Sequence, residues 1–170
     1  MDSDTTKPNW SHLALAIGGG MVLGSLVEKN KADESRKSRA EKDDPEETAD
    51  VCVEIGDLLE NWEPDEDCET EDDFTQDLAA YVDDNCDWEV EVYSNSPEGK
   101  PDILIDDKLA LEIKIGLKKG ERDRLVGQCA GYSRLWVTWA IVIGVGENKI
   151  GRLVDLLEDK GLDHIAVWKF

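Results

Sequence analysis

The spacing of apolar residues divides the chain into helical and strand-like stretches. Apolar side chains recur every three to four positions over 49–62 and 71–82, a pattern that predicts two packed helices. Over 88–93 they alternate with polar residues, which is typical of a half-buried strand. The same criteria predict the elements that follow: a hairpin over 101–114, a helix over 121–134, a strand over 135–143, a helix over 147–159 and a strand over 164–170.

From residue 71 onward, the predicted order is helix, three strands, helix, strand, helix and strand. The stretch over 135–143 is almost continuously apolar, as expected of a strand that is covered on both faces. Thr70 is a good N-cap for the helix that follows it, with Asp73 in the capping-box position. We therefore expect an α/β domain over 49–170, in which a central mixed β-sheet is flanked by helices.

The predicted hairpin carries charged residues on both of its strands. On the second strand, apolar residues alternate with Ala110, Glu112 and Lys114, so the last two side chains point to the same face. A three-residue connection over 106–108 places Asp102 opposite Glu112, with Cβ atoms about 5 Å apart. Carboxylates this close repel one another unless a cation lies between them, and a hard divalent ion fits best. The alternative is a solvent-facing ion pair between Glu112 and Lys114.

Charge is distributed unevenly along a strongly acidic chain. The 40 acidic and 19 basic residues give a net charge of −21, which is unexpected for a protein that contacts DNA. Because the acids are spread through well-patterned elements, a halophile's acidic surface is favoured over an acidic disordered chain. From 41 to 107 there are 27 acidic and two basic residues, whereas 108–134 has seven basic and three acidic ones. This sign change predicts a phosphate-binding face. Its candidate contacts are Lys118, Lys119, Arg122 and Arg124.

The N-terminal part of the chain differs in composition from the rest. Residues 1–9 are polar and are predicted to be disordered. Residues 10–27 are nearly free of charge and would make about 27 Å of helix, close to a bilayer core of about 30 Å. Basic residues mostly follow this segment, so a transmembrane anchor would leave the remaining domain in the cytoplasm. The alternative is an apolar helix packed on the domain. The charged residues 28–48 are predicted to form a linker.

The cysteines and histidines do not indicate a metal centre. Cys52, Cys68, Cys86 and Cys129 are widely spaced and include no C-x-x-C pair, so neither a zinc site nor an iron–sulfur cluster is expected. Reduced cytosolic thiols are the default expectation for such cysteines. His164 is expected to be a structural residue of the last strand.

The hairpin contains a motif with a known counterpart. Pro101-Asp102 is followed, after nine intervening residues, by Glu112-Ile113-Lys114. This order resembles the signature of the PD-(D/E)xK nuclease superfamily, which has a restriction-endonuclease-like fold. The resemblance implies a DNA nuclease that hydrolyses phosphodiester bonds with a metal-activated water. In it, Asp102 and Glu112 hold Mg²⁺ or Mn²⁺ with the Ile113 carbonyl as a further ligand, and Lys114 orients or activates the water.

The helix after the hairpin adds a second motif. Gln128 and Tyr132, four residues apart, resemble the Q-x-x-x-Y motif of the RecB-like members of the superfamily, which implies that they steady the active site and nearby DNA. With this motif, the resemblance covers about residues 70–145. Many relatives dimerise to cut two strands, so a homodimer is a further partner that the resemblance suggests.

Nucleases of this superfamily also carry an acidic metal ligand on the helix before the sheet. Glu71 is our candidate because it lies beside the apolar stripe that includes Phe74 and Leu78. Asp73 and Asp77 remain alternatives. Two other functions also remain open. The same fold could serve as a non-catalytic nucleic-acid-binding module, or as a membrane-anchored interaction module without a nucleic-acid role.

Overall fold

The computed structural model describes residues 44–97 and 99–170. The segments predicted to be disordered (1–9) and to anchor the chain in a membrane (10–27) lie outside the described residues. Within the described part of the chain, no helix combines the length and the apolar character that crossing a bilayer requires.

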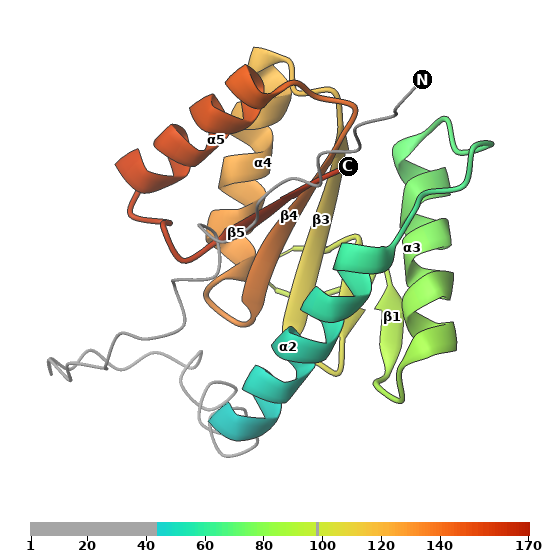
Figure 1. The fold of residues 1–170 in the computed structure, drawn as a ribbon. Coiled ribbons are helices and arrows are strands. Elements are labelled where there is room, and N and C mark those ends of the chain that lie inside the picture. The colour runs from blue at the N-terminus through green and yellow to red at the C-terminus, as the bar shows by residue number, and fades with distance from the viewer. Residues whose placement is uncertain (1–43, 98) are drawn as a thin grey trace, which may run out of the picture.

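The chain forms an α/β fold with a single five-stranded sheet among its described residues (Figure 1). Its elements are α2 (Pro45–Asn61), α3 (Glu71–Asn85), β1 (Val90–Val92), β2 (Ile103–Ile105), β3 (Leu109–Ile115), α4 (Lys119–Tyr132), β4 (Val137–Ile143), α5 (Glu147–Asp159) and β5 (Ala166–Lys169). The strand order is β1-β2-β3-β4-β5. The β1–β2 and β2–β3 pairs are antiparallel, whereas β3–β4 and β4–β5 are parallel. The mixed sheet and the predicted order of elements from residue 71 are confirmed.

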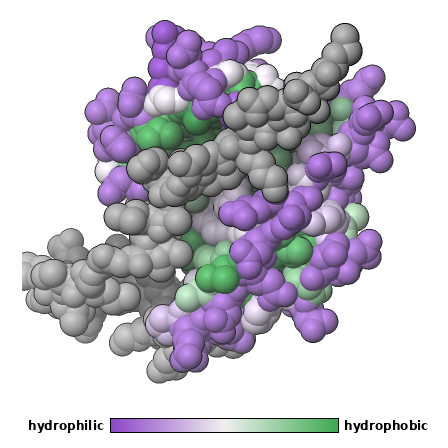
Figure 2. All heavy atoms as spheres, in the orientation of Figure 1, coloured by the Kyte–Doolittle hydropathy of each residue, from purple (hydrophilic) through white to green (hydrophobic). Residues whose placement is uncertain are grey.

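Helices cover both faces of the sheet, giving three layers (Figure 1). One apolar cluster joins α2 and α3 to the sheet, and a second joins α4 and α5 to its other face. Ile141 of β4 belongs to the first cluster and its neighbour Val142 to the second, as the continuous apolar run predicts. Figure 2 shows that hydrophilic residues dominate the visible outer surface, with smaller hydrophobic areas between them.

Helix α2 begins earlier than the apolar spacing predicts. Its first residue is Pro45, so residues 45–48 are helical and do not belong to the predicted linker over 28–48. Asp44 caps the helix, since its carboxylate accepts a hydrogen bond from the Glu46 N–H at 2.9 Å. Proline suits the first helical position because its missing N–H has no partner there in any case.

The two edge strands are shorter than predicted. Strand β1 spans only Val90–Val92 within the expected range 88–93, and β5 spans Ala166–Lys169 within 164–170. His164 is therefore not on the last strand, but is exposed in the turn before it. An edge strand pairs on one side only, so its ends lose ladder hydrogen bonds more easily than those of a central strand.

The β2–β3 hairpin has the register that its three-residue connection predicts. Ile103 pairs with Leu111, and Asp102 lies immediately before β2, beside the middle of β3. Asp106 and Asp107 in the connection adopt φ angles of 48° and 53°. Aspartate tolerates this left-handed conformation better than most residues, which makes this a favourable sequence for a tight hairpin.

Candidate active site

Strand β3 brings Glu112 and Lys114 into the interior of the protein. Ala110, on the same face of the strand, packs with Tyr132 of α4, whereas Ile113 belongs to the cluster beneath α2 and α3. Only 0% of Glu112 and 4% of Lys114 is exposed. The alternative of a solvent-facing ion pair is therefore wrong, because helices cover both faces of this strand.

Asp102 is held beside these residues by the backbone. The Ile113 N–H donates a hydrogen bond to Asp102 Oδ2 at 2.8 Å, and the Tyr93 N–H donates to the Asp102 carbonyl oxygen at 2.9 Å. Burial raises the pKa of Asp102, although the Ile113 hydrogen bond and the Lys114 charge oppose that shift. The position of this carboxylate therefore follows from the hairpin register.

The Lys114 ammonium lies among oxygen atoms from four residues. Its Nζ is 2.6 Å from the Ile113 carbonyl oxygen and 2.9 Å from Glu112 Oε1. It is 3.1 Å from Glu71 Oε2 and 3.9 Å from Asp102 Oδ2. These are the four groups that the sequence predicts as metal ligands, and all of them approach one positive charge.

Electrostatic effects at the site are strong because water is largely excluded. Burial, followed by the charge of Asp102, raises the pKa of Glu112 to about 7. Burial lowers the pKa of Lys114, but the surrounding carboxylates, Glu112 above all, outweigh this effect and raise it. Glu112 Oε2 is buried and accepts no hydrogen bond from any described residue. These hard oxygen donors, one of them unpartnered, fit Mg²⁺ or Mn²⁺.

The structure places one of the three acidic candidates on α3 at the site. Glu71, the first residue of α3, contacts the central ammonium. Asp73 instead completes the predicted capping box with Thr70. Asp77 accepts a hydrogen bond from the Trp62 indole N–H at 2.9 Å. The geometry therefore favours Glu71, and the two alternatives already have structural partners.

Tyr132 connects α4 to the loop that precedes Asp102. Its hydroxyl donates to the Lys100 carbonyl oxygen at 2.9 Å, and its ring packs against Gly99. An added Cβ at Gly99 would lie 2.8 Å from a ring carbon, and the φ angle there is 132°, so glycine is needed. Gln128, one turn earlier on α4, has a buried Oε1 that accepts no hydrogen bond from the described residues. Sequence reasoning missed Gly99, for which the only signal is a glycine within the turn.

The predicted phosphate contacts lie at the start of α4. Lys118, Lys119 and Arg124 are exposed, and Arg122 is partly buried. The charge of Arg124 acts to lower the pKa of Asp102, so this guanidinium lies within electrostatic reach of the site. The start of α4 therefore offers positive charge near the candidate metal ligands.

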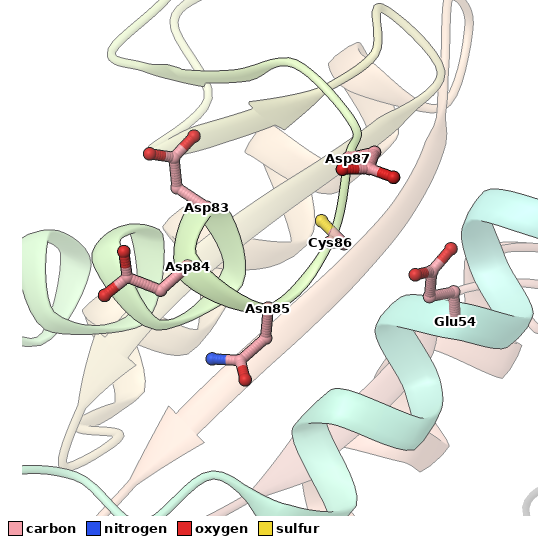
Figure 3. A pocket seen from close by; sticks show the side chains of 6 residues that line it. All are labelled: Glu54, Asp83, Asp84, Asn85, Cys86 and Asp87. Atoms are coloured by element: carbon pink, nitrogen blue, oxygen red, sulfur yellow. The ribbon is translucent and has the colours of Figure 1, made fainter.

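A second acidic cluster lies at the other end of α3 (Figure 3). The residues lining this hollow of about 470 Å³ are Glu54, Asp83, Asp84, Asn85, Cys86 and Asp87. Glu54 belongs to α2 and accepts a hydrogen bond from the Trp88 indole at 2.7 Å. A 15-residue helix is about 20 Å long, so the hollow is separate from the site at Glu71.

Neither acidic region has the geometry of a preformed metal-binding site. Within the described residues, no group of three or more His, Cys, Asp or Glu side chains is arranged to hold a metal ion as it stands. At the candidate site, the Lys114 ammonium lies among the carboxylates. Comparison with family models, with curated proteins and with solved structures finds no match to this chain. A function for the site must therefore be argued from its own chemistry.

Proposed function

We propose that this chain is a Mg²⁺- or Mn²⁺-dependent DNA nuclease with a restriction-endonuclease-like core. The observation that carries the proposal is the convergence of Asp102, immediately before β2, with Glu112 and Lys114 of the adjacent strand β3. A structural ion pair does not need three carboxylates around one lysine in a buried setting, because burying each additional charge costs free energy. The cost is understandable if the carboxylates also bind a divalent ion.

Four groups would hold the metal ion: the carboxylates of Glu71, Asp102 and Glu112, and the carbonyl of Ile113. When bound, such an ion lowers the pKa of an attacking water and stabilises the leaving oxygen. Lys114 would orient that water and offset the negative charge that builds up on the phosphate. The connection from Tyr132 to the loop before Asp102 would keep that ligand in place.

DNA would reach this site along the start of α4. The described residues up to 107 are strongly acidic and repel a polyanion, whereas 108–134 has more basic than acidic residues, so we expect DNA to approach along the start of α4. The proposed phosphate contacts are Lys118, Lys119, Arg122 and Arg124. Binding through them would weaken steeply as the salt concentration rises.

The test is cleavage of double- and single-stranded DNA with Mg²⁺, comparing wild type with Asp102→Asn. We expect the variant to lose about a hundredfold or more of the activity, because a ligand of the essential ion is neutralised. Asp84→Asn is the matched control, since it makes the same change in the distant hollow. Equal cleavage by wild type and Asp102→Asn would contradict the proposal. Salt-dependent DNA binding without cleavage would instead favour a non-catalytic scaffold.

A further inference from the structure

Among the described residues, the polar contacts of the Lys114 ammonium are with the proposed metal ligands. An ammonium has three protons to donate. Nζ donates to the Ile113 carbonyl oxygen and to Glu71 Oε2, and it forms an ion pair with Glu112 Oε1. Asp102 Oδ2 is the fourth oxygen, at 3.9 Å. The ammonium that is proposed to serve the water and the phosphate is therefore held by two hydrogen bonds and by ion pairs with the ligands themselves.

We infer that Lys114 occupies the divalent-ion position in the metal-free protein, and that metal loading exchanges this ammonium for the metal. The inference rests on the proposed function and concerns the regulation of the same site. One positive charge at this point lies within 4 Å of four oxygens from three separate segments, namely the start of α3, the residue before β2, and β3. A bound metal ion would interact with the same four oxygens.

Two arguments make the ammonium and the metal mutually exclusive. The first is steric, because Mg²⁺ needs its oxygen ligands at about 2.0–2.1 Å and the Lys114 Nζ already lies 2.6 Å from the Ile113 carbonyl oxygen. The second is electrostatic, because a monovalent and a divalent cation a few ångströms apart repel strongly in a buried site. Bound metal therefore releases Lys114 toward the mouth of the site, where the Glu71 side chain is 46% exposed.

The exchange also explains how a fully buried glutamate is tolerated without metal. Glu112 has no exposed surface, and a buried carboxylate without a partner is strongly destabilising. The tethered ammonium provides the compensating charge until a divalent ion replaces it. The alternative arrangement places the metal beside the unpartnered Glu112 Oε2, with Lys114 left in position.

Lysine modification of the intact wild-type protein separates these arrangements. Reductive methylation with formaldehyde and cyanoborohydride, read for each lysine by mass spectrometry, reports how accessible each amine is. We expect saturating Mg²⁺ to increase modification of Lys114 about tenfold, because the buried amine becomes exposed. Lys149, which is exposed on α5, serves as the internal control and stays unchanged. If Lys114 is as protected with Mg²⁺ as without it, the inference is overturned.

Calorimetric titration with Mn²⁺ tests the competition directly. We expect Lys114→Met to bind Mn²⁺ at least about tenfold more tightly than wild type, because the internal competitor is gone. Lys149→Met makes the same change at an exposed position of α5 and is the matched control, with a change of less than about threefold. Equal changes in the two variants, or no Mn²⁺ binding by either wild type or Lys114→Met, overturn the inference.

These readouts do not depend on catalysis. If metal displaces Lys114 but the protein does not cleave DNA, the inference stands and the proposed function is wrong. If the protein cleaves DNA while Lys114 stays protected from modification, the proposed function stands and the inference is wrong. The lysine modification uses wild-type protein only, so a failure of Lys114→Met to fold does not affect it.

Discussion

The two ends of helix α3 are both acidic, but only one of them is built like a site. At the first turn, Glu71 contacts a buried lysine that also pairs with the carboxylates of Asp102 and Glu112 in the β2–β3 hairpin. At the last turn, Asp83 and Asp84 are exposed and, together with Glu54 of α2, line a hollow of about 470 Å³ (Figure 3). The proposed chemistry lies at the first turn, where the Lys114 ammonium lies among the carboxylates, and not at the hollow.

The difference lies in what positions the carboxylates and in what compensates their charge. Asp102 and Glu112 are placed by the register of a hairpin and are largely withdrawn from water. The acids of the hollow are placed by a helix end and a loop, and water screens them. Acidic composition alone therefore does not identify a metal site. The metal site is proposed at the first turn of α3 because a fixed register, burial and a nearby counter-charge coincide there.

Metal binding provides the largest expected contrast between the two ends. With Mg²⁺ at about a hundred times its Kd, the folded state gains about 2.7 kcal/mol, which raises the melting temperature by about 5–10 °C. Glu112→Gln should abolish this increase because it neutralises a ligand. Asp84→Asn should leave it intact. Thermal unfolding with and without Mg²⁺ measures both, and an increase that survives Glu112→Gln but disappears in Asp84→Asn would place the metal in the hollow.

The pH dependence of stability gives the next contrast. Burial and the Asp102 charge raise the pKa of Glu112 from its ordinary value of 4.5 to about 7, so the folded protein retains a proton that the unfolded chain has released in that range. The free energy of unfolding of the metal-free protein should therefore fall, by about 1–3 kcal/mol from this group, as the pH rises from about 4.5 to about 7.

Denaturant titrations at several pH values in a chelator measure this effect. Glu112→Gln should flatten the profile over that interval, because the neutral amide neither gains nor loses a proton. Asp84→Asn, a change of the same kind at an exposed position, should leave the slope unchanged. If the stability of Glu112→Gln depends on pH as steeply as that of wild type, Glu112 is not the group that causes the pH dependence.

The helix ends themselves give the smallest contrast. At the N-terminal end, Thr70→Ala removes the capping box with Asp73 and should cost about 1 kcal/mol of stability. At the C-terminal end there are acids in the last turn and no basic residue, which opposes the helix dipole. Asp84→Lys should therefore stabilise the protein by about 0.3–1 kcal/mol. Chemical denaturation at low ionic strength measures both, and stabilisation by Thr70→Ala would contradict this contrast.

Much of the candidate site could be predicted from short-range patterns. Strand alternation and a three-residue connection are enough to bring Asp102 beside β3 and to place Glu112 and Lys114 on one face. The apolar stripe of α3 is enough to favour Glu71 over its acidic neighbours. Each of these inferences depends on the spacing of apolar residues or on the length of a loop, and both can be read from a short stretch of sequence.

The parts that could not be predicted depend on contacts between distant segments. The complete burial of Glu112 requires α4 to lie over β3, and the spacing within the strand does not contain that information. The position of the Lys114 ammonium depends on several rotatable bonds and on four oxygens from separate elements. Gly99 is required by the Tyr132 ring, which comes from 33 positions later in the chain. The start of α2 differs, since Asp44 and Pro45 were a readable capping signal.

Anomalous diffraction from crystals grown with Mn²⁺ tests the central claim most directly. We predict a single strong peak within the described part of the chain, bounded by the carboxylates of Asp102 and Glu112, the Ile113 carbonyl and Glu71, with the Lys114 ammonium displaced from that point. A peak confined to the acidic hollow at Asp83 and Asp84, or an ammonium that keeps its four oxygen neighbours at saturating Mn²⁺ with no metal beside it, would contradict the account.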